Sequence, residues 1–140
     1  MGRNTDKNLT LLPATVITAA VSGTAGTVYS LSRTAKYLLL ESIFTYGSGG
    51  TTAKFWIQTR VAGGTWRDVA NFAYTTSSAT KWSAVQTTVA LAAARTASDA
   101  ALADDTILDG FIGDELRIKY TTTGTYGGST TVTVLATVKE

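Results

Sequence analysis

The sequence predicts an all-β domain: an antiparallel β-sandwich or jelly roll of about eight strands with an extended N-terminal arm. Short runs of alternating apolar and polar residues are separated by Gly-, Ser- and Thr-rich turns, at the spacing of a sandwich. Threonine, whose branched side chain suits a pleated sheet, accounts for 27 of the 140 residues. This length fits one folding unit. We therefore expect residues 1–21 to form an arm or edge strand and residues 22–140 the β-sandwich domain.

The first predicted element is residues 9–21, which are apolar and extended. Pro13 lacks a backbone N–H, so it keeps this segment out of the centre of a sheet. Two interpretations remain open: an arm that pairs with a neighbouring subunit through main-chain hydrogen bonds, or the first edge strand of its own sandwich. The residues too apolar to be left in water, and hence candidate partner contacts, are Leu9, Leu11, Leu12, Val16 and Ile17.

The strongest strand signals lie in the middle of the chain. Residues 37–46 form the most apolar run, and residues 53–61 alternate cleanly. Gly63 and Gly64 then separate this second run from residues 66–74, which predicts a hairpin.

The C-terminal half supplies further strands at residues 81–91, 115–123 and 130–138. The last two flank a Gly-rich turn and are predicted to form a second hairpin. Residues 90–105, which precede the predicted strand at 115–123, are rich in alanine and predict either a short helix or an ordered loop. The side chains expected in the core are Leu39, Ile43, Phe55, Ile57, Val61, Leu116, Ile118 and Val134.

Composition excludes several classes of chemistry. Cysteine and histidine are both absent, which removes thiol nucleophiles, Cys/His zinc sites and imidazole-dependent triads. A formal net charge of +2 is too small to indicate a nucleic-acid partner. The apolar stretches are too short to span a membrane. No layout of a secretory signal is visible, and we expect no cofactor.

The acidic residues do not predict catalysis or a metal site. Six of the ten acids lie in residues 99–115, without the spacing of an EF-hand, so we expect a solvated loop that binds no metal. Glu41 stands in an apolar run and would need a partner if buried, and Arg60 or Arg117 on a neighbouring strand would serve. We expect the protein not to be an enzyme.

The surface composition favours assembly. Charged residues make up only 16% of the chain, so a Thr- and Ser-rich surface is weakly protected against association. Trp56 lies on the polar side of its strand and Trp82 near a strand start. An outward tryptophan is either covered by a neighbouring loop or an anchor at a protein interface. Both are therefore candidate partner contacts.

Two stretches carry a family resemblance. Both resemble small β-sandwich virion proteins of tailed bacteriophages. The first runs from Phe55 to Tyr74 and holds the Gly-Gly hairpin followed by Thr-Trp-Arg-Asp-Val, and the second runs from Asp109 to Tyr126. The similarity covers roughly residues 36–138. It implies a structural protein of the virion, a capsid decoration or cement protein on the capsid surface, without catalytic residues. It also implies the major capsid protein or other virion subunits as partners, and a homo-oligomer, with a trimer favoured.

Two other functions remain open. One is a tail, neck or head-fibre component of the same structural class. The other is a carbohydrate-binding β-sandwich module, in which outward Trp56 and Trp66 would stack on sugar rings. The mass of the purified protein, alone and mixed with empty capsids, would separate these functions, because a carbohydrate-binding module would stay monomeric and ignore capsids.

Overall fold

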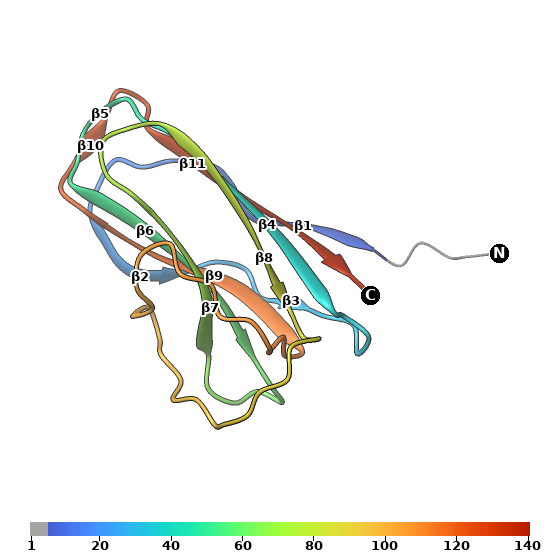
Figure 1. The fold of residues 1–140 in the computed structure, drawn as a ribbon. Helices are drawn as coiled ribbons and strands as arrows, with labels where there is room; N and C mark the ends of the chain where they lie inside the picture. The colour runs from blue at the N-terminus through green and yellow to red at the C-terminus, as the bar shows by residue number, and fades with distance from the viewer. Residues whose placement is uncertain (1–5) are drawn as a thin grey trace.

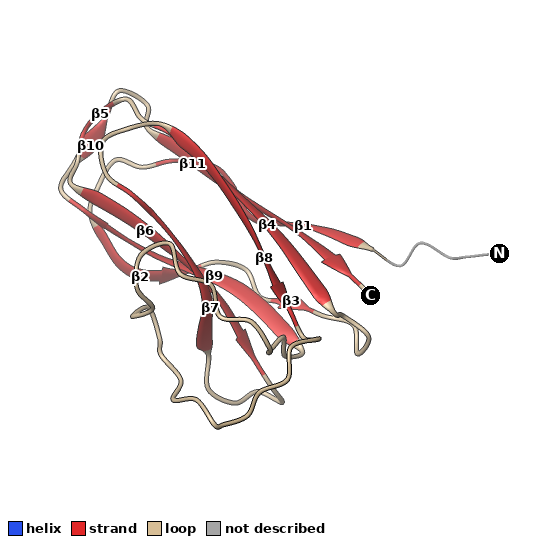
Figure 2. Cartoon of the chain, viewed as in Figure 1, coloured by secondary structure: helices blue, strands red, loops and turns tan. Residues whose placement is uncertain are grey.

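The computed structural model describes residues 6–140, and these contain strands and loops but no helix (Figure 2). Three two-residue strands are β3 (Tyr29–Ser30), β5 (Ser48–Gly49) and β10 (Tyr126–Gly127). The eight longer strands are β1 (Lys7–Val16), β2 (Val21–Ala25), β4 (Tyr37–Thr45), β6 (Thr52–Arg60), β7 (Arg67–Tyr74), β8 (Ala79–Gln86), β9 (Glu115–Thr123) and β11 (Thr131–Lys139). The all-β prediction is confirmed.

The eight longer strands form two packed antiparallel sheets, and the short β5 and β10 pair with each other (Figure 1). Sheet 1 has the order β1-β11-β4-β8, and sheet 2 has the order β2-β9-β6-β7, with β3 also pairing with β9. The chain changes sheet at almost every connection, and only β6 and β7 are consecutive long strands that pair with each other. This strand order is that of a jelly roll, one of the two architectures that the sequence predicts.

One predicted hairpin is confirmed and the other is wrong. β6 pairs with β7, with Phe55 opposite Phe72. The intervening turn places Ala62 and Gly63 at positive φ. β9 and β11 do not pair, because β9 belongs to sheet 2 and β11 to sheet 1. Each of these two strands has one apolar face, so the Gly-rich turn between them lets both faces bury against each other across the sandwich.

The core lies between the two sheets, as predicted for Phe55, Ile57, Leu116, Ile118 and Val134, which are fully buried. Leu39 is 39% exposed, Val61 is 45% exposed and Ile43 is half-buried, so these three predictions are wrong.

The physical reasons for these errors are local. In β4 the inward positions are Leu38, Leu40, Ser42 and Phe44. Because this strand is apolar on both faces, its pattern alone does not determine which face turns inward. Phe44, one of the inward residues, stacks on Tyr74 of the other sheet with ring centroids 4.6 Å apart. Val61 lies beyond the last residue of β6, where the alternation no longer applies.

β1 is an edge strand of its own sheet, the second of the two interpretations of the N-terminal segment. It pairs with β11 from Lys7 to Val16, and the register shifts on either side of Leu12. These irregularities accompany Pro13, and they allow the adjacent Leu11 and Leu12 both to be buried. No arm reaches away from the body within residues 7–16. The first five residues of the predicted arm lie outside the described residues.

The segment between β8 and β9 is an ordered loop, so the open choice for residues 90–105 is decided against a helix. Its second half runs along the free edge of β7. The amide of Asp68 donates to the carbonyl of Ser98, the amide of Leu108 donates to the carbonyl of Val69, and Ala70 forms a bridge with Ile107. The loop therefore covers this edge of sheet 2 (Figure 1).

Candidate functional site

The two candidate tryptophans lie in different environments. Trp56 is only 5% exposed, and its indole Nε1 donates to the carbonyl of Leu102 at 3.0 Å. The loop after β8 thus covers Trp56, and its prediction as a partner contact is wrong. Trp82 lies on the outer face of β8 and is 80% exposed. It is the most exposed large apolar side chain among the described residues.

The apolar residues of the N-terminal segment are mostly unavailable to a partner. Leu9, Leu11, Leu12 and Ile17 are buried in the core of their own sandwich, so their prediction as partner contacts is wrong. Val16 alone of this set is exposed, at 55%. The pairing of β1 with β11 turns these four side chains into the core of their own chain, where they need no partner subunit to cover them.

Trp82 is part of an apolar area on the outer face of sheet 1. Glu41 lies directly between Trp82 and Leu135 in the strand register, and Leu39 lies opposite Ala84. Leu39 and Leu135 are both more than a third exposed, and the area forms a shallow hollow. We call this area the Trp82 face, and it consists of Leu39, Glu41, Trp82, Ala84 and Leu135.

Glu41 is exposed at the centre of the Trp82 face and forms no ion pair within the described residues. The predicted partners are engaged elsewhere: Arg60 Nε lies 2.9 Å from a carboxylate oxygen of Glu115, and Arg117 Nε donates to Gln58. A pairing was expected only for a buried Glu41. Glu41 is exposed, and both arginines belong to the other sheet, so the pairing does not form. Glu41 thus presents an uncompensated negative charge to any partner of this face.

The side chain of Asp68, which no sequence pattern singled out, has five hydrogen-bond donors. Asp68 on β7 is 2% exposed, and its carboxylate accepts hydrogen bonds from three successive loop amides, those of Ala100, Ala101 and Leu102. Ser98 Oγ and Gln58 Nε2 also donate to it. The five donors saturate the carboxylate, so Asp68 fastens the loop and has no free lone pair for catalysis.

Trp66 is half-buried and contacts two cationic side chains. The guanidinium groups of Arg60 and Arg117 lie 4.5 and 4.4 Å from the centroid of its ring. A sugar ring would have to displace them in order to stack there. Since Trp56 is buried, neither tryptophan of the carbohydrate-binding interpretation is a freely exposed ring.

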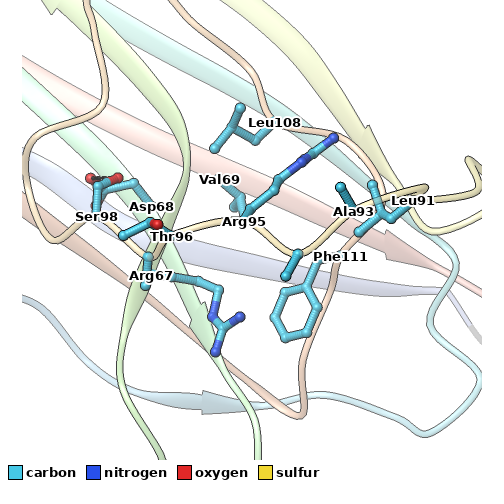
Figure 3. Close-up of a pocket in the computed structure, with 12 residues that line it drawn as sticks. Arg67, Asp68, Val69, Leu91, Ala93, Arg95, Thr96, Ser98, Leu108 and Phe111 are labelled. Atoms are coloured by element: carbon cyan, nitrogen blue, oxygen red, sulfur yellow. Dashed lines mark hydrogen bonds between the residues drawn. The ribbon is translucent and has the colours of Figure 1, made fainter.

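A small pocket lies between β7 and the loop (Figure 3). The guanidinium of Arg67 lies 4.5 Å from the ring centroid of Phe111, and Arg95 donates to the carbonyl of Asp109. Figure 3 shows these two arginines extending in different directions, with Asp68 beside Ser98 at the other end. In this pocket Ser98 Oγ donates to the Asp68 carboxylate, but that carboxylate also accepts four other hydrogen bonds, so it is not free to act as a base.

The acidic residues of the loop form separate ion pairs with lysines on the strands. Asp104 pairs with Lys54, Asp105 with Lys81 and Asp99 with Lys119, at 2.9–3.0 Å. The hydrogen bond from Lys119 lowers the pKa of Asp99 below its usual value, with help from Gln58. Within residues 6–140, no three carboxylates gather as a metal site would require.

A Ser-x-x-Lys spacing, which some hydrolases use for a nucleophile and its base, occurs at Ser78 and Lys81. The two side chains serve other partners. Ser78 Oγ accepts a hydrogen bond from the amide of Tyr46, whereas Lys81 Nζ donates to Asp105 and to the carbonyl of Ala73. This pair is therefore structural.

Family models, curated proteins and solved structures were all compared with this chain, and none of them matches it. Among the described residues, no helix is long and apolar enough to cross a bilayer. The Trp82 face is thus the candidate functional site, and it rests on the geometry of the chain itself.

Proposed function

We propose that the chain is a non-enzymatic structural protein of a phage virion, a capsid decoration or cement protein that docks on the capsid through the Trp82 face. The observation that carries this proposal is the 80% exposure of Trp82 within an apolar area on the outside of a regular sheet. Tryptophan is the residue most enriched at the energetic centres of protein interfaces. A large aromatic side chain left in water is accounted for if a partner covers it.

The chemistry of the Trp82 face specifies what such a partner would offer. Trp82 and Leu135 lie on either side of Glu41, and Leu39 precedes it on the same strand. Threonines at neighbouring strand positions form a polar rim. An apolar centre with a polar rim is the usual anatomy of a protein interface. Glu41 would require a basic side chain opposite, because a buried unpaired carboxylate is unfavourable.

The fold and the sequence support a virion role by analogy. Jelly rolls occur in viral capsid proteins and also in lectins, so the fold alone does not distinguish these functions. The resemblance of Phe55 to Tyr74 and of Asp109 to Tyr126 to phage virion proteins favours the first. The low charge content of the chain suits a subunit that remains docked in an assembly.

Of the other functions, the carbohydrate-binding module is not favoured, because Trp56 is buried and the half-buried ring of Trp66 contacts the guanidinium groups of Arg60 and Arg117. A tail, neck or head-fibre component would use the same kind of surface on a different virion partner. A binding experiment is therefore needed to distinguish a capsid partner from a tail, neck or head-fibre partner.

The experiment is co-sedimentation of the chain with empty shells assembled from the major capsid protein of the same phage genome. We expect saturable binding of the natural chain, and at least a tenfold loss of affinity for Leu135→Lys, which places a charge in the apolar centre. Thr76→Lys, at an exposed position of the loop between β7 and β8 and outside the Trp82 face, is the matched control and keeps full binding. Absence of binding by the natural chain, or equal binding by Leu135→Lys, would reject the proposal.

A further inference from the structure

The free edges of the two sheets are protected unequally. An unpaired edge strand is a template for pairing with another chain, and proteins normally block it with proline, bulges, charges or a covering loop. Among the described residues, β1 carries Pro13 and two register shifts, and the loop after β8 covers the edge of β7. β2 is short and irregular, with a register shift beside Gly23. These three edges are therefore poor templates.

The edge of β8 has less protection, because within the described residues the loop after β8 bonds the main chain of this edge only at Gln86. This strand is eight residues long, contains neither proline nor glycine, and pairs with β4 without a register shift. Its one charged residue, Lys81, is turned inward to Asp105. Among the described residues, β8 is thus the most regular free edge, and its single charge is already paired.

The direction of its main-chain groups follows from Gln86. The amide of Gln86 donates to Asp109 and its carbonyl accepts from Gly110, so both groups point away from β4. In an antiparallel ladder the N–H and C=O of one residue point to the same side, and this side alternates along the strand. The main-chain groups of Thr80, Trp82 and Ala84 therefore also point away from β4. Nothing within the described residues pairs with them.

We propose that two copies of this chain associate through antiparallel pairing of their β8 strands, around a two-fold axis at Trp82. In this register Trp82 lies opposite the partner's Trp82, and Thr80 lies opposite the partner's Ala84. All three outward-facing residues of each strand then exchange main-chain hydrogen bonds. The two sheets 1 become one continuous sheet, and the two Trp82 faces become one apolar surface.

Charge and hydrogen bonding select this register over its neighbours. A shift of two residues in one direction sets Lys81 opposite the partner's Lys81, and like charges directly opposite each other are destabilising. A shift in the other direction requires the main-chain groups of Gln86, which Asp109 and Gly110 already occupy. In the register centred on Trp82, Lys81 faces the partner's Ser83, and this contact is compatible.

The space beside β8 fits an incoming strand. An open groove runs along this edge, between Thr80–Ser83 on one side and Asn71, Asp105 and Ile107 on the other. Asn71 is fully buried, and its Oδ1 has no hydrogen-bond donor in the structure. The inward-facing side chains of an added strand, a lysine and a serine, would bring donors to this groove.

This assembly differs from the trimer that the family resemblance implies. Pairing of one strand with its own copy is isologous and generates a two-fold axis, which closes at two subunits. A three-fold ring would instead require β8 to pair with a different edge, and Pro13 with its adjacent bulges makes β1 unsuitable. The dimer is therefore the assembly that the edge supports.

Sedimentation equilibrium of charge-swapped variants tests the pairing and its register. We expect the natural chain to dimerise and Trp82→Lys and Trp82→Glu each to weaken dimerisation at least tenfold, because two like charges meet at the axis. An equimolar mixture of the two variants should associate at least tenfold more tightly than either alone. A monomeric natural chain at high micromolar concentration, or a mixture no tighter than its components, would overturn the proposal.

A second pair of variants separates edge pairing from the fold. Ala84→Pro removes an amide that takes no part in the ladder with β4, so the chain should remain folded by circular dichroism but lose dimerisation, whereas Ala84→Val should keep it. Dimerisation of the folded Ala84→Pro variant would also overturn the proposal. Leu135→Lys should remain dimeric while losing capsid binding, so failure of this proposal is distinguishable from failure of the proposed function.

Discussion

At the scale of single residues, one buried carboxylate determines how the longest loop is held. Asp68 accepts three successive main-chain amides, and Ala100 at the first of them adopts a positive φ of 56°. The sequence offered little sign of this role, because an aspartate in an alternating strand is normally assigned to solvent. Trp56 was misassigned for the same reason, since the loop that covers its strand comes from more than 40 residues later.

Removal of this carboxylate should loosen the loop. In Asp68→Ala, the three loop amides and Ser98 Oγ lose a buried acceptor, and we expect the free energy of unfolding to fall by about 3 kcal/mol. Denaturant unfolding measures this change. Asp104→Ala is the control: it removes a half-exposed partner of Lys54 and should cost no more than about 0.5 kcal/mol. A comparable loss in the two variants would show that Asp68 does not hold the loop.

A buried tyrosine, Tyr74, should make the free energy of unfolding decrease at alkaline pH. Burial raises the pKa of Tyr74 from 10.0 to about 12, and the nearby Asp105 carboxylate also raises it. Since the folded pKa exceeds the unfolded one, the stabilisation is complete below pH 10 and is lost as the pH rises towards 12. The loss attributable to this group should reach about 2–3 kcal/mol.

The variant Tyr74→Phe isolates this contribution. It keeps the ring that stacks on Phe44 but removes the hydroxyl that donates to the carbonyl of Ser42. The difference in unfolding free energy between the natural chain and the variant, measured across pH 8–12, should shrink as the pH rises. A difference that stays constant over this range would mean that Tyr74 ionises equally in both states.

At the scale of elements, the sequence predicted those strands whose two faces differ in polarity. β6 and β9 alternate, so their inward residues and the β6–β7 hairpin were predicted correctly. β4 is apolar on both faces, and only the packing of Phe44 on Tyr74 from the other sheet shows which face is inside. A Gly-rich turn fits a hairpin and a change of sheet equally well, which is why the partner of β11 was mispredicted.

β1 is the element whose removal tests the edge-strand assignment. Deleting residues 1–16 removes the buried Leu9, Leu11 and Leu12 and exposes the edge of β11, so we expect the chain to lose cooperative thermal unfolding by circular dichroism. Val16→Ser, at a position 55% exposed, is the control and should change stability by no more than about 0.5 kcal/mol. A truncated chain that unfolds cooperatively at an unchanged temperature would show that β1 is dispensable.

At the scale of the whole molecule, the fold class was predictable but the location of the functional surface was not. Alternation and turn spacing indicate a sandwich, whereas strand order depends on which edges meet in space. The loop after β8 covers Trp56 on the outside of sheet 2, and the guanidinium groups of Arg60 and Arg117 contact the ring of Trp66. The outer face and free edge of sheet 1 remain open, and both meet at Trp82.

The central claim, that this protein acts by burying the Trp82 face in an assembly, is tested most directly by acrylamide quenching of tryptophan fluorescence. Trp82 is the one strongly exposed tryptophan, so the difference between the natural chain and Trp82→Phe reports its accessibility. We expect this difference to be large in dilute solution and to disappear when the chain is bound to capsid shells. A Trp82 that remains as accessible on the shell as in dilute solution would contradict the account.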